Sequence, residues 1–599
     1  MAESGRSNGR HADLSELQAE IAELAERAGR LYGNALQRVS QDDGFQVPDP
    51  GVVAGLVQRV TQKLFEQPGK LAEGQQELAR NYLQLWYHMV RRLAGEEVEP
   101  LIEPERQDKR FADDAWQQNV FFDFLKQSYL LTARWLQQTV KEIEGLDPKT
   151  RLQADFYTRQ FVDAFAPSNF LATNPRALRE AVDSGGESLK RSLANLMGDL
   201  ERGKGQLAIS QTRFAAFTVG ENIARSPGKV VYQNDLMQLI QYAPTTATVA
   251  KRPLLIVPPW INKFYILDLR PSNSFVRHAV DQGHTVFIVS WVNPDERLSG
   301  KGFDSYMQEG PLAALAAIEQ ATGERETNLV GYCIGGTLSA ATLAYMAATG
   351  DQRVASATLL TSLTDFREAG ELQVFVDDEQ LELLDKHMHR KGYLESRHMA
   401  QVFNMMRDND LIWSYVVNNY LLGREPPAFD LLYWNADATR MPAMMHSFYL
   451  RKMYKENKLI EPGGIELLGV PIDLRKVEVP AYFLSTREDH IAPWRCTYTA
   501  TQLFSGPRKF VLAMSGHIAG VVNPPGGNKY GYWTNAQLPP APDAWLENAT
   551  QHAGSWWTDW YGWLRTYAGG EVPARQPGDG RLAPIEGAPG SYVLVMAQD

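Results

Sequence analysis

The amino-acid sequence predicts an α/β fold with a mostly parallel sheet, preceded by a helical N-terminal part. From residue 218 onward, short β-branched runs bounded by proline or glycine alternate with segments of helical length. Strands that alternate with helices are typical of a parallel sheet covered on both faces. The expected strands are GKVVYQN, PLLIVPPW, HTVFIVSWV, TNLVGYC, VASATLLTSL, PAYFLST and RKFVLAM.

The first expected element is a helix over residues 13–32. Asp13 and Glu16 have the spacing of a capping box, and the leucines that follow recur with a 3-4 rhythm. The apolar seam is under three heptads long, which is shorter than a sustained coiled coil requires. The helix therefore either docks on its own chain or contacts a partner.

Changes of pattern divide the chain into four predicted regions. A proline-containing charged stretch at residues 93–111 separates two helical parts, and the α/β alternation begins after them. Over 100 residues of helical pattern later interrupt that alternation, as a cap over an active site often does. We predict an N-terminal helical segment (1–104), a helical domain (105–215), an α/β domain (216–572) with a cap insertion at about 365–477, and a loosely ordered tail (573–599).

Composition excludes several classes of protein. The 599 residues carry a formal net charge of −11 without a basic run, so no nucleic-acid partner is expected. The N-terminus lacks the apolar core of a signal peptide, and no apolar run is long enough to span a bilayer, which predicts a cytoplasmic protein. Two cysteines and no H-E-x-x-H motif predict neither a disulfide framework nor a metal site.

The stretch TNLVGYCIGGTL contains the candidate nucleophile, Cys333. A strand runs directly into a helix there, and Gly331 and Gly335 flank the cysteine at the spacing G-x-C-x-G. A nucleophile at such a turn sits on a strained bend at a helix N-terminus, where the dipole and backbone N–H groups favour a thiolate. The alternative, a buried structural cysteine, predicts no exposed sulfur at a turn.

Two further candidates follow the next expected strands. Asp489 comes after PAYFLST and His517 after RKFVLAM, which is the order nucleophile, acid, histidine of α/β-hydrolase folds. Both positions lie at the carboxyl edge of the sheet, where sites of such folds gather. Asp365, after VASATLLTSL, is an alternative acid, and His490 is expected to shape the loop beside Asp489.

An oxyanion hole in this fold uses two backbone N–H groups, one from the residue after the nucleophile and one from a loop after an early strand. Ile334 follows Cys333, and Ile261 lies in the segment PLLIVPPWIN just after a strand. We predict that these two residues supply the donors. The segment VPPWIN is alternatively only a rigid turn.

Several motifs together show that the chain resembles the class I polyhydroxyalkanoate synthases, from about residue 105 to 570. The most specific are GYCIGGTL, PPWINKFYILDL, STREDHIAPW and SGHIAGVVNPP, supported by FAPSNFLATNP, VGENIARSPGKVVYQN, DLLYWNADATRMP and GSWWTDWYGWL. The resemblance implies that Cys333 carries the acyl group, that His517 is the general base and that Asp489 is its partner. It also implies that Trp434 lies in the cap near the entrance, whereas Trp260 replaces a residue that is smaller in many relatives.

By the same resemblance, the substrate is a 3-hydroxyacyl-CoA, and no other cofactor is needed. The GYCIGGTL box is closer to enzymes of short acyl groups such as (R)-3-hydroxybutyryl. The expected partners are the growing polyester, the granule surface, granule-associated proteins and a second copy of the chain. Two alternatives are a cysteine-dependent thioesterase or esterase of the dienelactone hydrolase type and a non-catalytic scaffold.

The tryptophans of GSWWTDWYGWL also have a simple structural interpretation. Trp556, Trp560 and Trp563 recur at i, i+4 and i+7, which places them on one face of a helix. We predict that this helix packs on the core; contact with hydrophobic polymer is the alternative.

Overall fold

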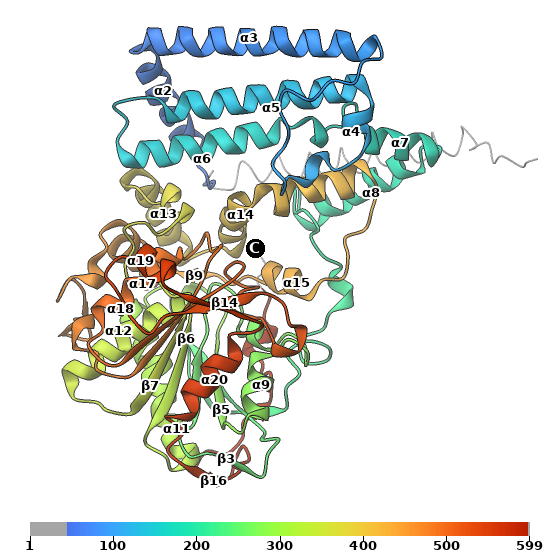
Figure 1. Ribbon diagram of the computed structural model, residues 1–599. Helices are drawn as coiled ribbons and strands as arrows, with labels where there is room; N and C mark the ends of the chain where they lie inside the picture. The colour runs from blue at the N-terminus through green and yellow to red at the C-terminus, as the bar shows by residue number, and fades with distance from the viewer. Residues whose placement is uncertain (1–44, 597–599) are drawn as a thin grey trace, which may run out of the picture.

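The computed structural model describes residues 45–596, with a helical layer above an α/β domain (Figure 1). The helix expected at residues 13–32 lies outside the described residues. Helix starts in the layer follow local capping rules: Asp49, Asn119, Asp147 and Asn174 each accept backbone N–H groups of the helix that follows. The helices are α2 (Pro50–Phe65), α3 (Pro68–Leu93), α4 (Ala115–Gln118), α5 (Val120–Lys141), α6 (Pro148–Ala164), α7 (Pro175–Asp183) and α8 (Glu187–Arg202).

An eleven-stranded sheet forms the centre of the α/β domain, in the order β15-β14-β13-β12-β7-β6-β4-β5-β2-β1-β17. The strands from β13 to β5 in this order pair in parallel, and antiparallel strands extend both edges. This arrangement confirms the predicted fold class. The strands are β1 (Gly228–Gln233), β2 (Met237–Tyr242), β4 (Leu254–Val257), β5 (Val286–Trp291), β6 (Thr327–Tyr332), β7 (Val354–Leu360), β12 (Ala481–Thr486), β13 (Arg508–Ala513), β14 (Gly531–Thr534), β15 (Thr550–Ala553) and β17 (Glu586–Gly587).

Each of the seven expected strands is present, but the sequence pattern misses four strands of this sheet, namely β2, β14, β15 and β17. Of these, β2 is buried along its whole length. Gln238 and Gln241 interrupt its apolar residues and read as exposed positions, yet both side chains are fully buried. Gln238 donates hydrogen bonds to Gln233 and to Ser591, which explains how one of these amides is accommodated in the interior.

Helices cover both faces of the sheet. Along β5, Val286 and Ile288 join one buried cluster with α9 (Phe275–Asp281) and α20 (Trp557–Arg565), while Phe287 and Val289 join another with α11 (Ala313–Thr322) and α12 (Ile334–Thr349). In the first cluster Trp556, Trp557 and Trp560 are buried and Trp563 is half-buried, so the tryptophan helix packs on the core as predicted. The remaining elements of this domain are β3 (Thr248–Ala250), α10 (Phe303–Met307), α17 (Trp494–Tyr498), α18 (Ala500–Leu503), α19 (Pro542–Glu547) and β16 (Glu571–Pro573).

Strands β7 and β12 pair directly with each other. The long segment between them therefore leaves the sheet and returns to it as an insertion. Figure 1 shows helices of this insertion between the helical layer and the sheet. The cap therefore stands over the carboxyl ends of the parallel strands. Its α-helices and strands are α13 (Asp378–Lys391), β8 (Tyr393–Leu394), α14 (Ser396–Met406), α15 (Asp430–Ala436), β9 (Met441–Pro442), α16 (Ala443–Phe448), β10 (Glu466–Leu467) and β11 (Val470–Pro471), and a π-helical segment, Tyr449–Lys455, follows α16.

The tail from residue 573 differs from the loosely ordered segment that its composition predicts. Strand β17 pairs with the edge strand β1, and Val593 is 1% exposed. The buried ammonium of Lys263 donates to the carbonyl of Val593 at 2.7 Å. Edge pairing and this buried hydrogen bond hold the tail on the α/β domain despite its proline and glycine content.

Helix α6 of the layer is fastened to the cap segment that precedes α13. Lys149 donates to the carbonyls of Gln373 and Val376, and Gln153 donates to the carbonyl of Val374 at 3.0 Å. Burial lowers the pKa of Lys149 to about 8. The helical layer thus holds a segment of the cap through backbone carbonyls.

Replacing Lys149 with methionine is expected to lower the free energy of unfolding by about 1–3 kcal/mol, because two carbonyls lose their donor. Thermal unfolding of the full-length variant measures this effect. Lys251→Met is the matched control, since the Lys251 side chain is exposed. Equal unfolding temperatures for the two variants would contradict the role of α6 as a support for the cap.

Candidate active site

Cys333 lies at the turn between β6 and α12, where its backbone has φ 56° and ψ −127°. A non-glycine residue in this left-handed region is strained, and such strain is typical of functional sites. Cys333 N–H donates to the carbonyl of Leu360, while the carbonyl of Cys333 accepts from Gly336 and Thr337 at the start of α12. The side chain is half-buried and lines a cavity. The nucleophile turn expected from the sequence is therefore present.

Glycines allow this turn to pack closely on its neighbours. A Cβ atom on Gly335 would lie 2.3 Å from the carbonyl oxygen of Val257, and one on Gly336 would lie 1.8 Å from Oγ of Ser362. Gly331 has no more room, since its Cβ would meet the Cα of Gly336 at 2.5 Å. The absence of side chains here brings the start of α12 against the loop after β4.

The variant Gly335→Ala is expected to lose about 3 kcal/mol of stability, because its Cβ meets rigid backbone atoms rather than a flexible side chain. Displacement of α12 should also reduce activity. Gly562→Ala is the matched control: a Cβ there has open space in α20, and the change should add about 0.5–1 kcal/mol. Chemical denaturation of both variants measures the difference; a stable, fully active Gly335→Ala protein would refute the packing argument.

His517 and Asp489 are in direct contact at the same edge of the sheet. Nδ1–H of His517 donates to Oδ2 of Asp489 at 2.6 Å, and both side chains are buried. The other carboxylate oxygen accepts the N–H groups of Ile491 and Ala492 at 2.9 and 2.8 Å. These bonds orient the carboxylate toward the imidazole, so the loop after β12 positions the acid.

His517 also interacts with Cys333. Burial by itself lowers the pKa of His517, but the negative charges of Asp489 and Cys333 outweigh it and raise that pKa well above its ordinary value. Because Nδ1 is engaged by Asp489, Nε2 is the nitrogen left to face the sulfur. The ring also stacks on Tyr332 with 5.7 Å between centroids, which restricts its orientation. The site therefore favours the protonated form of the His517 imidazole.

The structure separates the two candidate acids. Asp365 is held by the guanidinium of Arg367 at 2.6 Å and by the amide of Asn457 at 2.8 Å, and it makes no hydrogen bond to His517 among residues 45–596. Asp489, in contrast, contacts the imidazole directly. His490 follows Asp489 but does not line the cavity, and burial lowers its pKa to about 4.

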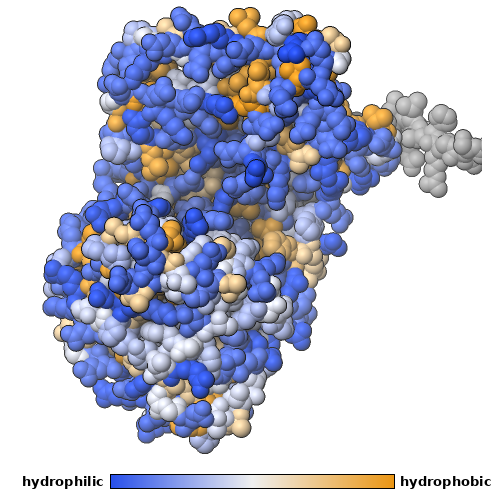
Figure 2. All heavy atoms as spheres, in the orientation of Figure 1, coloured by the Kyte–Doolittle hydropathy of each residue, from blue (hydrophilic) through white to orange (hydrophobic). Residues whose placement is uncertain are grey.

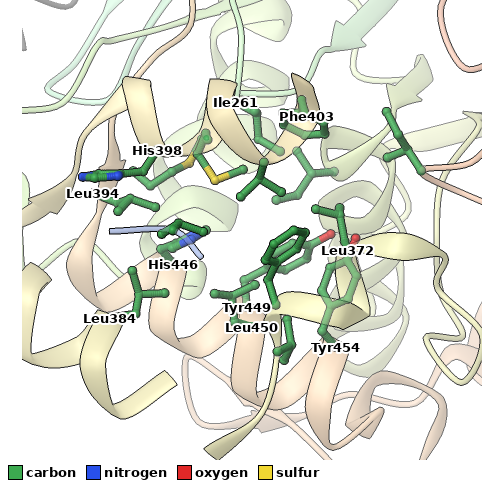
Figure 3. A pocket seen from close by; sticks show the side chains of 18 of the residues that line it. Ile261, Leu372, Leu384, Leu394, His398, Phe403, His446, Tyr449, Leu450 and Tyr454 are labelled. Carbon is green, nitrogen blue, oxygen red and sulfur yellow. The ribbon is translucent and has the colours of Figure 1, made fainter. Parts of the chain in front are cut away.

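A mostly apolar cavity brings the remaining candidates together. Ile334, Ile261 and Trp434 line it with Cys333 and His517, and Trp434 donates through Nε1 to the carbonyl of Lys263 at 2.7 Å. Figure 3 shows the part of the wall that the cap supplies. Trp260 does not line the cavity; its ring packs in the core with three other aromatic residues, Trp291, Phe303 and Tyr306.

Cap residues that the sequence pattern does not single out form much of this wall. Tyr449 and Tyr454 line the cavity near Leu372, and burial raises the pKa of both phenols, with the charge of Cys333 contributing. The hydroxyls therefore remain protonated donors at neutral pH. The apolar members of the wall from the cap are Leu372, Phe375, Val376, Leu383, Leu384, Leu394, Met399, Val402, Phe403, Met441 and Leu450.

The fold and the site define an α/β-hydrolase-type enzyme with cysteine in the nucleophile position. A sequence profile of the α/β-hydrolase fold matches residues 253–524, and a profile of the poly-β-hydroxybutyrate polymerase N-terminus matches residues 107–279. The chain belongs to the poly(3-hydroxyalkanoate) polymerase family, as its relatives show, and it is an enzyme of acyltransferase type.

Three relatives cover most of the chain. The poly(3-hydroxyalkanoate) polymerase of Methylorubrum extorquens is 52% identical over 540 residues, which are 90% of this chain and 89% of that protein. The subunit PhaC of the Rhizobium meliloti polymerase is 48% identical over 588 residues, or 98% and 96% of the two chains. The corresponding subunit from Cupriavidus necator is 45% identical over 537 residues, or 88% and 89%.

Proposed function

We propose that this chain carries out the polymerisation typical of its family by way of an acyl-cysteine, with short 3-hydroxyacyl-CoA thioesters such as (R)-3-hydroxybutyryl-CoA as substrates. One observation carries the proposal: Cys333 meets an Asp489–His517 pair in a mostly apolar cavity. The roles of these residues follow from their chemistry and contacts.

In the loading step, Nε2 of His517 takes the proton of the Cys333 thiol, and the thiolate attacks the carbonyl carbon of the CoA thioester. The bond to the CoA sulfur breaks, and CoA leaves with the proton from His517. Exchange of one thioester for another changes the free energy little. Backbone N–H groups of Ile334 and Ile261 stabilise the oxyanion, since both residues border the same cavity.

In the elongation step, His517 takes the proton of a 3-hydroxyl group, and the oxygen attacks the acyl carbon on Cys333. The carbon–sulfur bond breaks, an ester forms, and the thiol regains its proton from His517. An oxygen ester is less activated than a thioester, so this step runs downhill. Asp489 orients the imidazole and stabilises its charged form in both steps. No cofactor other than the CoA thioester takes part.

Water would hydrolyse the acyl-cysteine and make the enzyme a thioesterase. The apolar wall from the cap disfavours water near Cys333 and therefore favours transfer to the 3-hydroxyl. This wall therefore favours polymerisation over the alternative function, a thioesterase or esterase of the dienelactone hydrolase type.

We also propose that the helical layer attaches the enzyme to the polymer surface. On α3, an exposed stripe recurs at helical spacing, and Figure 2 shows apolar residues gathered on this layer. In the described part of the chain, no helix has the length and apolar character needed to cross a membrane. The stripe consists of Leu83, Trp86, Tyr87, Val90 and Leu93.

We expect Leu83→Ser with Trp86→Ser to weaken attachment of the full-length enzyme to polyester particles, because the double change removes apolar surface that contacts polymer. Sedimentation of particles with bound enzyme measures attachment, and light scattering reports the mass. If the double variant had a lower mass in solution than the wild-type enzyme but attached to polyester equally well, the stripe would be assigned to a homodimer interface instead. Attachment and mass both equal to those of the wild type would contradict either use.

The test of the function is incubation of the purified full-length protein with 3-hydroxybutyryl-CoA and, separately, 3-hydroxyoctanoyl-CoA. Released CoA and the acyl product are identified in both. Polyester from the shorter thioester at the higher rate is the expected result. Free 3-hydroxybutyrate as the main product would favour the thioesterase, faster use of the longer thioester would overturn the chain-length assignment, and absence of CoA release would favour a scaffold.

A further inference from the structure

Three buried side chains converge in the cap, at the edge of the cavity. His387 lies on α13, His398 on α14, and Glu395 at the turn that leads into α14. They are only 1%, 5% and 3% exposed, respectively. Each can place one nitrogen or oxygen atom within 4.8 Å of those of the other two. The short strand β8 reverses the chain after α13 and brings the three residues together.

The existing contacts leave one of these side chains unexplained. Nε2 of His387 lies 2.6 Å from Oε2 of Glu395, while Nε2 of His398 lies 3.7 Å from the same oxygen. Neither ring nitrogen of His398 has a hydrogen-bond partner among residues 45–596. Buried polar atoms of folded proteins are nearly always paired, so two unpaired nitrogens on one buried ring indicate a missing binding partner.

Two imidazoles and one carboxylate are a donor set that suits a divalent transition metal. Zinc binds such ligands at about 2.0–2.2 Å, which in a tetrahedral site separates the ligand atoms by roughly 3.3 Å. The separations of 2.6 and 3.7 Å lie on either side of that value.

Two cationic side chains next to the cluster contact the carboxylate of Glu395. The ammonium of Lys391 contacts Oε1 of Glu395, and the guanidinium of Arg397 lies 3.5 Å from the same oxygen. These groups leave Oε2 directed at the imidazoles, but they also repel a cation. Magnesium and calcium, which depend on oxygen ligands, are disfavoured, whereas a metal that binds imidazole strongly tolerates the site.

The surroundings leave access from the cavity. Phe45 stacks on His387 with 4.3 Å between centroids and meets His398 edge-on at 5.1 Å, which covers one side of the cluster. His398 itself lines the cavity, and Figure 3 shows its side chain near Leu394. A water molecule from the cavity can therefore complete a fourth coordination position.

We propose that His387, Glu395 and His398 bind one divalent transition-metal ion, with Zn²⁺ as the best match, and that this ion joins α13 to α14. Leu384 on α13, Leu394 on β8 and Met399 on α14 line the cavity. The metal thus stabilises a part of the cap that shapes the active site. It takes no part in the transfer of the acyl group.

The test uses the full-length Cys333→Ala protein after treatment with a chelator, so that the thiol does not bind the added metal. Titration with Zn²⁺ by calorimetry should show one equivalent bound and a higher unfolding temperature. Titration with Co²⁺ should give the visible absorption of a four-coordinate site. His398→Gln should weaken Zn²⁺ binding by at least about tenfold. Loss of a residue that only supports a ligand already weakens metal binding by about that factor, so loss of a ligand should cost no less.

Two further variants, in the same background, make the result specific. His387→Gln retains an amide that can hydrogen-bond to Glu395 but loses the imidazole, so it should weaken Zn²⁺ binding as much as His398→Gln. His389→Gln changes an exposed histidine on the same helix and should leave binding unaltered. If His398→Gln does not fold, His387→Gln decides. No saturable Zn²⁺ binding, or equal affinity in all folded variants, would overturn the proposal.

Discussion

The variant Cys333→Ala is expected to release no CoA from 3-hydroxybutyryl-CoA and to form no polyester, with a rate lower by about 10⁴-fold or more. Alanine cannot form the thioester that carries the acyl group, and neither His517 nor Asp489 replaces it. The position of Cys333 on a strained turn next to His517 leads us to expect this loss. Release of CoA, followed continuously, measures the rate.

The protein contains its own control for this experiment. Cys496 is buried, its thiol donates to the carbonyl of Glu368, and burial raises the pKa of that thiol to about 11. Cys496→Ala should therefore retain activity, and a thiol reagent should label the wild type at Cys333 alone. Activity that survives Cys333→Ala, or disappears in Cys496→Ala, would contradict the proposed nucleophile.

The variant Asp489→Asn is expected to lower the rate by about 10²–10⁴-fold, as removal of the acid does in comparable triads. The negative charge of Asp489 raises the pKa of His517. Replacement by the neutral amide should therefore lower that pKa and disfavour the imidazolium. The asparagine also disfavours the tautomer that presents Nε2 to the thiol. Rates of polymerisation, with the imidazole pKa from NMR titration, measure the two effects.

Asp365→Asn makes the same chemical change at the alternative acid. Asp365 is engaged by Arg367 and Asn457, so this variant should lose stability while its rate and the pKa of His517 change little. A large loss of rate in Asp365→Asn with a normal rate in Asp489→Asn would exchange the two assignments. Equal rates in both variants and the wild type would leave His517 without an acid partner and refute the triad.

The local parts of the site could be predicted because their signals are short in sequence. The turn at Cys333 needs a strand, closely spaced glycines and a helix, all within a dozen residues. The strands before Asp489 and His517 have clear β-branched patterns, and parallel strands bring their carboxyl ends to one edge. The family motifs in the same segments are equally local.

Other parts depended on contacts between distant residues. Asp365 and Asp489 both follow strands, and only the tertiary structure shows which carboxylate reaches His517. The proline and glycine content of the tail predicts a loose segment. Nothing in that composition indicates that β17 pairs with β1, more than 300 residues earlier. Strand β2 was missed because buried glutamines look like exposed residues until their partners are known.

By itself the sequence determined the fold class, the turn at Cys333 and the order of the candidate triad, since these arise from hydrophobic period, turn chemistry and chain order. The tertiary structure decided the acid, the cavity wall and the cluster of His387, Glu395 and His398. The loop after β12 places the acid, the fold of the cap over the sheet forms the cavity wall, and α13 and α14 bring the cluster together. Such side-chain distances have no signature in local sequence. Packing between segments that are distant in sequence brought the groups of the active site together.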